Sequence, residues 1–81
     1  MRIAEIGKIV WFHRKKSGMT QKQLADLAGV GKTVVFDVEK GKETVRLDTL
    51  QRLLTTLNIK MHLTSPLLHL MEEEHANSKS V

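Results

Sequence analysis

Apolar residues recur at steps of three and four positions up to residue 57, which is the spacing of amphipathic helices. Thr20, with Gln23 three positions later, has the sequence of a capping box and predicts the start of a helix. Gly18 and Gly29 are expected to end helices, since glycine has no Cβ to oppose a positive φ angle. The helices that this pattern predicts cover residues 3–16, 21–28, 32–39 and 47–57.

From residue 59 the period changes to two, which is typical of a half-buried strand. A strand needs a neighbour for its backbone hydrogen bonds, and the chain holds no second strand candidate. Antiparallel pairing with a second copy of the chain is the simplest source of these bonds, and an irregular extended segment lying on the helices is the alternative. The predicted dimer strand consists of Ile59, Lys60, Met61, His62, Leu63 and Thr64.

Residues 66–81 differ in character from the preceding chain. Four large apolar side chains within five residues, from Leu67 to Met71, precede three glutamates and a polar end. Terminal segments of this kind are commonly disordered. We therefore expect a flexible acidic and apolar tail, with a docking peptide that becomes ordered on a partner as the alternative.

Composition indicates one small all-α domain. The chain has 81 residues, 41% of them apolar, and no cysteine, which excludes a disulfide scaffold and a cysteine-based zinc module. Its apolar runs are too short to cross a bilayer, and no signal-peptide pattern opens it. We expect a cytoplasmic protein without a membrane partner.

Charge is distributed unevenly along the chain. Residues 1–65 hold twelve Lys/Arg against six Asp/Glu, a net charge of +6, whereas residues 66–81 hold one against three. A basic body favours a polyanionic partner, either nucleic acid or an anionic membrane surface, because positive potential concentrates such ligands. A lysine coat that serves only solubility is the alternative.

The sequence carries no pattern of catalytic or metal chemistry. Its four histidines lack the spacing of a zinc site, and there is no glycine-rich phosphate loop, nucleophile elbow or pair of acid and base residues. We expect no enzyme, no cofactor and no metal.

The predicted helices 21–28 and 32–39, joined by a turn that contains Gly29 and Gly31, have the arrangement of a helix-turn-helix. The second helix of such a pair is presented outward and can enter a major groove. Lysine donates to guanine acceptors there, and threonine contacts bases through its hydroxyl or methyl group. The predicted outward face carries Lys32, Thr33, Phe36 and Asp37, and the anchoring face carries Val35 and Val38.

An ordered set of positions within residues 6–57 resembles the phage-repressor-like (Cro/C1-type, XRE) helix-turn-helix family. The matching positions are Arg14, Gly18–Gln21, Leu24–Ala25, Ala28–Val30, Val35 and Glu39–Gly41. The leucine-rich fourth helix and residues 58–64 after it look like those of the HipB-type antitoxins of this family, in which the strand pairs across the dimer. The resemblance implies a lambda-repressor-like four-helix DNA-binding domain over residues 1–65.

The resemblance also implies roles for single residues. Lys32 and Thr33 match base-reading positions, Gln21 matches a contact to the DNA backbone, and Lys42 would bind phosphate. Arg14 and Glu39 match a partly buried ion pair. The implied protein is a homodimeric repressor of its own operon on operator DNA at the nucleoid, and the antitoxin of a HipA-like kinase toxin.

Two positions depart from the family pattern, and alternatives follow from them. Phe36 either touches a thymine methyl or is half-buried against the preceding helix. Asp37 either accepts from a cytosine amino group or is held away from the DNA backbone. Trp11 either covers the strand region or forms a contact patch for another protein. The competing functions are a phage or mobile-element repressor without a toxin, and a protein-interaction adaptor on the same fold.

Overall fold

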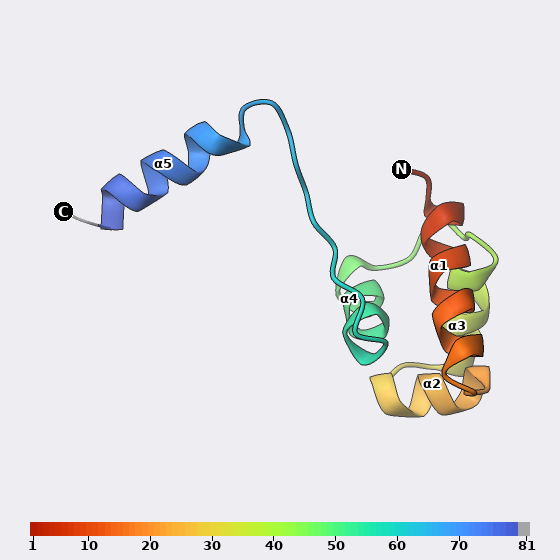
Figure 1. Ribbon diagram of the computed structural model, residues 1–81. Coiled ribbons are helices and arrows are strands. Elements are labelled where there is room, and N and C mark those ends of the chain that lie inside the picture. The colour runs from red at the N-terminus through yellow and green to blue at the C-terminus, as the bar shows by residue number, and fades with distance from the viewer. Residues whose placement is uncertain (80–81) are drawn as a thin grey trace.

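The computed structural model describes residues 1–79 and contains five helices within them (Figure 1). Helices α1 to α4 form a bundle, and α5 stands apart from it at the end of an extended segment. The first three helices have the predicted bounds, and the fourth ends one residue earlier. The helices are α1 (Ile3–Lys16), α2 (Gln21–Ala28), α3 (Lys32–Glu39), α4 (Leu47–Thr56) and α5 (Leu68–Lys79).

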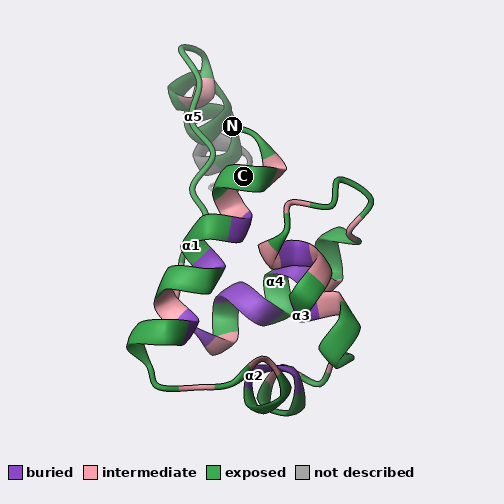
Figure 2. Cartoon of the chain, turned by 90° about the vertical axis from the view of Figure 1, so that its right-hand side faces the viewer, coloured by how far each residue is buried: buried purple, intermediate pink, exposed green. Residues whose placement is uncertain are grey.

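One apolar core lies between α1, α2, α3 and α4 (Figure 2). Its largest fully buried side chains come from all four helices, so each helix has a stripe that faces the others. α3 is rich in β-branched residues, which lowers its intrinsic helix propensity, so packing has to hold it in place. The core side chains are Val10, Leu24, Ala25, Val35, Val38, Leu50, Leu53, Leu54 and Leu57.

α1 and α3 approach each other closely at Gly7. A Cβ added at Gly7 would collide with the backbone carbonyl oxygen of Val38, near the end of α3. Only glycine permits this contact between a helix and the backbone of its neighbour. The close approach fixes where the end of α3 sits on α1.

The connection from α2 to α3 is set by local backbone chemistry. The Gln23 amide donates to Thr20 Oγ1 at 3.0 Å, and the Thr20 amide donates to Gln23 Oε1 at 2.8 Å, which completes the predicted capping box. Gly29 ends α2 in the left-handed conformation, with φ at 72°, and α3 begins three residues later, after Gly31. These caps produce the tight turn of a helix-turn-helix.

Residues 59–64, predicted as a strand, form none in the described part of the single chain. The Ile59 amide still donates to the Leu54 carbonyl at 2.8 Å, and residues 59–62 line a surface hollow with α1 and α4. The chain beyond them runs extended, away from the bundle. Leu63 is 82% exposed. A lone strand has no partner for its ladder of hydrogen bonds, so pairing across a dimer stays a prediction that one chain cannot display.

Residues 66–81, predicted as a flexible tail, contain the helix α5; Ser80 and Val81 lie outside the described residues. Leucine, methionine and glutamate are good helix formers, and this local propensity accounts for the helix. Leu70 and Met71 are exposed on it, and so is Leu67 just before it. Among the described residues, no helix has the length and apolar character that a membrane span requires.

Candidate nucleic-acid interface

The helix-turn-helix unit, residues 21–39, presents one face of α3 to the outside. The side chains of Val35 and Val38 are 0% and 1% exposed and anchor the inner face of this helix. Lys32, Thr33 and Phe36 are exposed on the outer face. The sequence predicted this division between an inner and an outer face, and packing of the two valines maintains it.

Four residues predicted to contact DNA line one shallow depression of the surface. Gln21 at the start of α2 is adjacent there to Lys32, Thr33 and Phe36 of α3. Asp37 and Lys42 lie elsewhere, beside a second hollow between α3 and the loop that follows it. The structure therefore separates the predicted DNA-contacting residues into two neighbouring groups.

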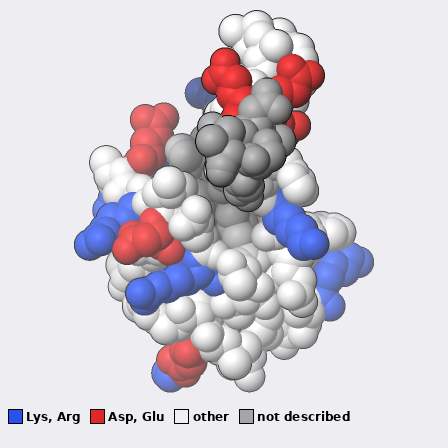
Figure 3. All heavy atoms as spheres, turned by 90° about the vertical axis from the view of Figure 1, so that its left-hand side faces the viewer, with Lys and Arg blue, Asp and Glu red and all other residues white. Residues whose placement is uncertain are grey.

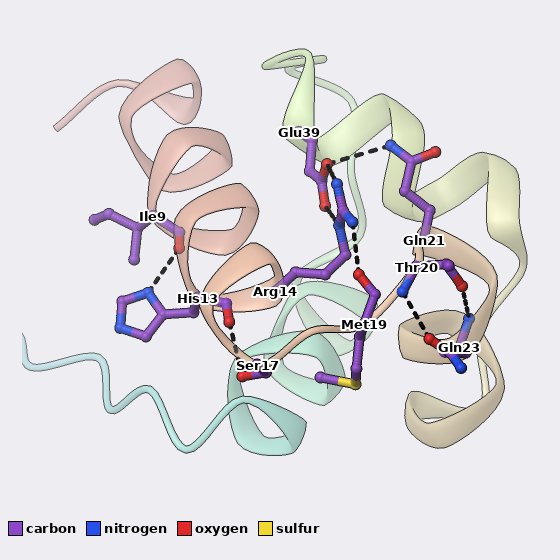
Figure 4. A network of polar contacts seen from close by, with 9 residues as sticks. All are labelled: Ile9, His13, Arg14, Ser17, Met19, Thr20, Gln21, Gln23 and Glu39. Atoms are coloured by element: carbon purple, nitrogen blue, oxygen red, sulfur yellow. Dashed lines mark hydrogen bonds and ion pairs between the residues drawn. The ribbon is translucent and has the colours of Figure 1, made fainter.

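Arg14 and Glu39 form a buried ion pair between α1 and the last residue of α3 (Figure 4). Arg14 Nε donates to Glu39 Oε2 at 2.6 Å and Arg14 Nη2 donates to Glu39 Oε1 at 2.9 Å, a bidentate arrangement. Arg14 is only 8% exposed. Its third bond runs from Nη1 to the Met19 carbonyl at 2.8 Å. The guanidinium thus joins α1, α3 and the loop before α2.

The hydrogen bond with Glu39 raises the pKa of Arg14 although burial opposes it, so the guanidinium stays charged. Gln21 Nε2 also donates to Glu39 Oε1, at 3.2 Å. An amide nitrogen carries two hydrogens, so the second hydrogen of Gln21 can still be donated to a phosphate. The ion pair therefore holds the side chain at the start of α2 as well as the end of α3.

Asp37 and Lys42 form an ion pair at the outer edge of α3, with Lys42 Nζ 3.4 Å from Asp37 Oδ2. The Lys42 side chain is 58% exposed and that of Asp37 is 32% exposed. Pairs this open to water contribute little to stability. Their effect is local and electrostatic, because the carboxylate lies beside the lysine predicted to bind phosphate.

Phe36 is 44% exposed, and Lys40 Nζ lies 4.8 Å from the centroid of its ring, within range of a cation–π contact. Lys40 belongs to the family match, but no contact between its side chain and Phe36 was predicted from the sequence. The spacing of four residues on one helix could have indicated this contact. It adds a cation next to the exposed ring.

α1 carries a second exposed aromatic surface away from α3. Trp11 is 48% exposed and Phe12 is 49% exposed, and Lys16 Nζ lies 5.6 Å from the Phe12 ring centroid. Trp11 is therefore only half covered by the described part of the chain. In the described part of the chain, no group of three His, Cys, Asp or Glu residues is placed to hold a metal ion.

The sequence profile described as helix-turn-helix matches residues 13–63. The chain belongs to the XRE-type helix-turn-helix family. The matched region contains α2, α3 and α4, the Arg14–Glu39 ion pair and most of the extended segment. The protein is accordingly a helix-turn-helix transcriptional regulator of the XRE type.

Two curated relatives carry the same description. A helix-turn-helix-type transcriptional regulator of Sinorhizobium fredii is 35% identical over 63 residues, which cover 78% of this chain and 83% of the relative. Another from Haemophilus influenzae is 37% identical over 57 residues, 70% of this chain and 57% of the relative. The chain thus spans little more than half of the second relative.

Two solved structures with the same fold cover most of the chain. The restriction–modification controller protein C.AhdI of Aeromonas hydrophila is 31% identical, with a TM-score of 0.65 over 72% of this chain and 88% of that one. A chain of the HipA–HipB–O2–O3 complex has a TM-score of 0.73 over 82% of this chain and 93% of that one, at 21% identity. The second likeness shows the fold alone.

Proposed function

We propose that this XRE-type protein is a homodimeric repressor that inserts α3 into the major groove of operator DNA. The observation that carries the proposal is the exposed outer face of α3, with Lys32 and Thr33 at its start and Gln21 of α2 in the same depression. The net charge of +6 on residues 1–65 supports it, because phosphates attract such a body. The protein would work in the cytoplasm, at the nucleoid.

The proposed roles follow from the chemistry of each side chain. Lys32 donates to guanine, and Thr33 contacts a base through its hydroxyl or methyl group. The exposed ring of Phe36 packs on a thymine methyl, and Asp37 accepts from a cytosine amino group wherever it leaves Lys42. Gln21 and Lys42 bind phosphates. Arg14 and Glu39 stay away from DNA and keep α3 seated.

We propose that the dimer forms by antiparallel pairing of residues 59–64. The alternating pattern of this segment, its extended path and the exposure of Met61 and Leu63 support the pairing. A two-fold axis would place two copies of α3 on one side of the dimer. Such a dimer reads inverted half-sites about one helical turn apart.

Two lysine variants test DNA binding. Lys32→Ala is expected to relax base preference at one operator position and to cost about 1–3 kcal/mol of binding free energy, whereas Lys42→Ala should weaken all sequences alike and reduce the salt slope by about one. Lys22→Ala on α2, which removes a lysine already paired with Asp26, is the matched control. Binding isotherms on operator and random DNA at several salt concentrations measure both effects.

Parental affinity in both variants would refute the DNA-binding role. It would favour the alternative function, a protein-interaction adaptor on the same fold.

A finer proposal concerns a protein partner. We propose that the protein is the antitoxin of a HipA-like kinase and represses its own operon together with that toxin. The likeness of fold to a chain of the HipA–HipB–O2–O3 complex supports this, and so does the half-exposed pair Trp11 and Phe12, which is large enough to anchor a protein. A stand-alone regulator without a toxin is the alternative.

Copurification separates these two possibilities. The chain is expressed with the product of the neighbouring open reading frame, and the complex is sought by size exclusion with and without promoter DNA. A stable complex that Trp11→Ala weakens supports the antitoxin role. Failure of a kinase-like neighbour to bind, or absence of such a neighbour, favours the stand-alone repressor.

A further inference from the structure

The bundle has an apolar surface hollow beside the start of the extended segment. Its floor comes from α1, from α4 and from the residues after α4, and Lys60 lies at its rim. No helix of the described chain fills it. The apolar residues that line it are Met1, Ile6, Ile9, Leu54, Ile59 and Met61.

α5 has an apolar stripe without a cover. Leu67, just before the helix, and Leu70 and Met71 within it recur at the spacing of one helical face and are 66%, 46% and 61% exposed. The glutamates that follow them, Glu72–Glu74, make the arm acidic. A single helix of this length is marginal in water, so contact with another surface would stabilise it.

Antiparallel pairing of residues 59–64 would bring the stripe and the hollow together. In an antiparallel pair whose two-fold axis passes at Met61, Leu63 of one chain lies opposite Ile59 of the other, because opposite residues point to the same face of the sheet. Ile59 lines the hollow. The chain beyond Thr64 therefore emerges next to the hollow of the second copy, whereas it runs away from the hollow of its own chain (Figure 1).

The charges of the two surfaces are complementary. Lys60 lines the hollow and Lys8, next to Ile9 in the chain, is exposed on α1, while residues 66–81 hold three glutamates and one lysine. Figure 3 shows acidic side chains at the C-terminal helix, and basic side chains together with some acidic ones over the body beneath it. This arrangement attracts the arm to a basic body.

We propose that the two copies exchange C-terminal arms, residues 66–79, so that Leu67, Leu70 and Met71 of each copy fill the hollow of the other. The inference rests on the proposed dimer and deepens it. A pair of strands alone is marginally stable, and packing against a helix is what such a pair needs. The exchanged α5 supplies that helix, so the hollow and the arm form one interface.

Substitution of the stripe in the full chain tests the exchange. Leu70→Glu and Met71→Glu are each expected to raise the dimer dissociation constant about tenfold or more, because each places a charge in an apolar contact. Glu73→Gln, at a position of the same helix outside the face of Leu70 and Met71, is the matched control with little effect. Sedimentation equilibrium measures the constants, and circular dichroism checks that the bundle, whose core lies elsewhere, stays folded.

The outcomes distinguish this inference from the proposed function. Unchanged dissociation constants in both glutamate variants would overturn the exchange and leave the strand-paired dimer standing. A parental chain that is monomeric at the concentrations used for operator binding would overturn both.

The absence of cysteine from the chain permits a direct test of which copy receives the arm. An Ile9→Cys chain is refolded with a Leu70→Cys chain of different mass and oxidised. A disulfide between the two unlike chains is expected, and Lys22→Cys paired with Leu70→Cys is the control that should not cross-link. A disulfide within a single chain carrying Ile9→Cys and Leu70→Cys, without the mixed product, would show that the arm folds back on its own body and would overturn the exchange.

Discussion

The bundle, residues 3–57, and the chain after it use similar apolar residues with opposite results. In the bundle Leu53 is completely buried, while Leu63 in the extended segment is 82% exposed. The bundle supplies the neighbours of each of its core side chains from its own four helices. The segment and α5 have local structure without such neighbours. An apolar side chain of this protein is therefore buried only where several helices pack around it. The bundle provides such packing, and the single chain provides none for Leu63.

The largest effect is expected from breaking the ion pair that closes the bundle. Glu39→Ala leaves Arg14 buried without its carboxylate, so the free energy of unfolding should fall by about 3–5 kcal/mol. Asp26→Ala, which removes one member of the exposed Lys22–Asp26 pair, should cost no more than about 0.5 kcal/mol. Urea denaturation of the three proteins gives both values. Similar losses of unfolding free energy in Glu39→Ala and Asp26→Ala would show that burial of the Arg14–Glu39 pair does not determine its contribution to stability.

The same substitution in the two regions tests the comparison directly. Leu53→Ala is expected to cost about 2–5 kcal/mol because it leaves a cavity in the core. Leu63→Ala should change the free energy of unfolding by less than about 0.5 kcal/mol at concentrations where the chain is monomeric. Chemical denaturation followed by circular dichroism measures both. A large loss at Leu63 under these conditions would show that the bundle itself covers the segment.

A smaller loss is expected where backbones touch inside the bundle. Gly7→Ala places a methyl group against the Val38 carbonyl, and the shift that relieves the collision should cost about 1–3 kcal/mol. Gly31→Ala is the matched control, because no atom lies within 4 Å of its added Cβ, and it should change stability by less than about 1 kcal/mol. Thermal unfolding compares the two. Equal losses of stability in Gly7→Ala and Gly31→Ala would show that the loss comes from replacing a flexible glycine and not from the contact with the Val38 carbonyl.

The smallest effect is expected on the exposed surface of the bundle. Partial desolvation raises the pKa of Asp48, but the Thr49 amide and Arg46 lower it more, so its pKa lies below the usual value. A carboxyl group with a lowered folded-state pKa stabilises above its unfolded pKa, and this contribution disappears as the pH falls through the lowered pKa. Asp48→Asn should therefore lower the midpoint temperature of thermal unfolding slightly at neutral pH. In strong acid, where Asp48 is protonated, the midpoint temperatures of the two proteins should be equal. A difference that persists in acid would assign the effect to something other than charge.

Most of the bundle could be predicted from sequence because its determinants are local. The three-and-four spacing predicted α1, and Gly18, Gly29 and Gly31 predicted where the first three helices begin or end. Thr20 with Gln23 marked the cap that the structure contains. The fourth helix ends one residue early because Leu57 already leaves the helical conformation. The later elements were harder. Composition favoured disorder at α5, although its leucines and glutamates favour a helix, and a strand at 59–64 cannot form without a second chain.

The site was predictable in its residue types and less so in its contacts. Which face of α3 is exposed followed from the period of the helix. The hydrogen bond from Gln21 to Glu39 and the pairing of Asp37 with Lys42 depend on how helices and loops meet, which no periodicity contains. The Arg14–Glu39 pair was expected only through family resemblance, since twenty-five positions separate its members.

The carboxylate beside Lys42 has a consequence for how such a protein would search a genome. A phosphate has to compete with Asp37 for the Lys42 ammonium group, which lies 3.4 Å from the carboxylate. In the proposed role of Lys42 as a phosphate ligand, this competition would weaken attachment to operator and to arbitrary sequences alike, and the side chains proposed to read bases at the start of α3 lie beside a different hollow. For an operator-binding regulator, a shorter residence time on non-specific DNA means that its operator is found sooner.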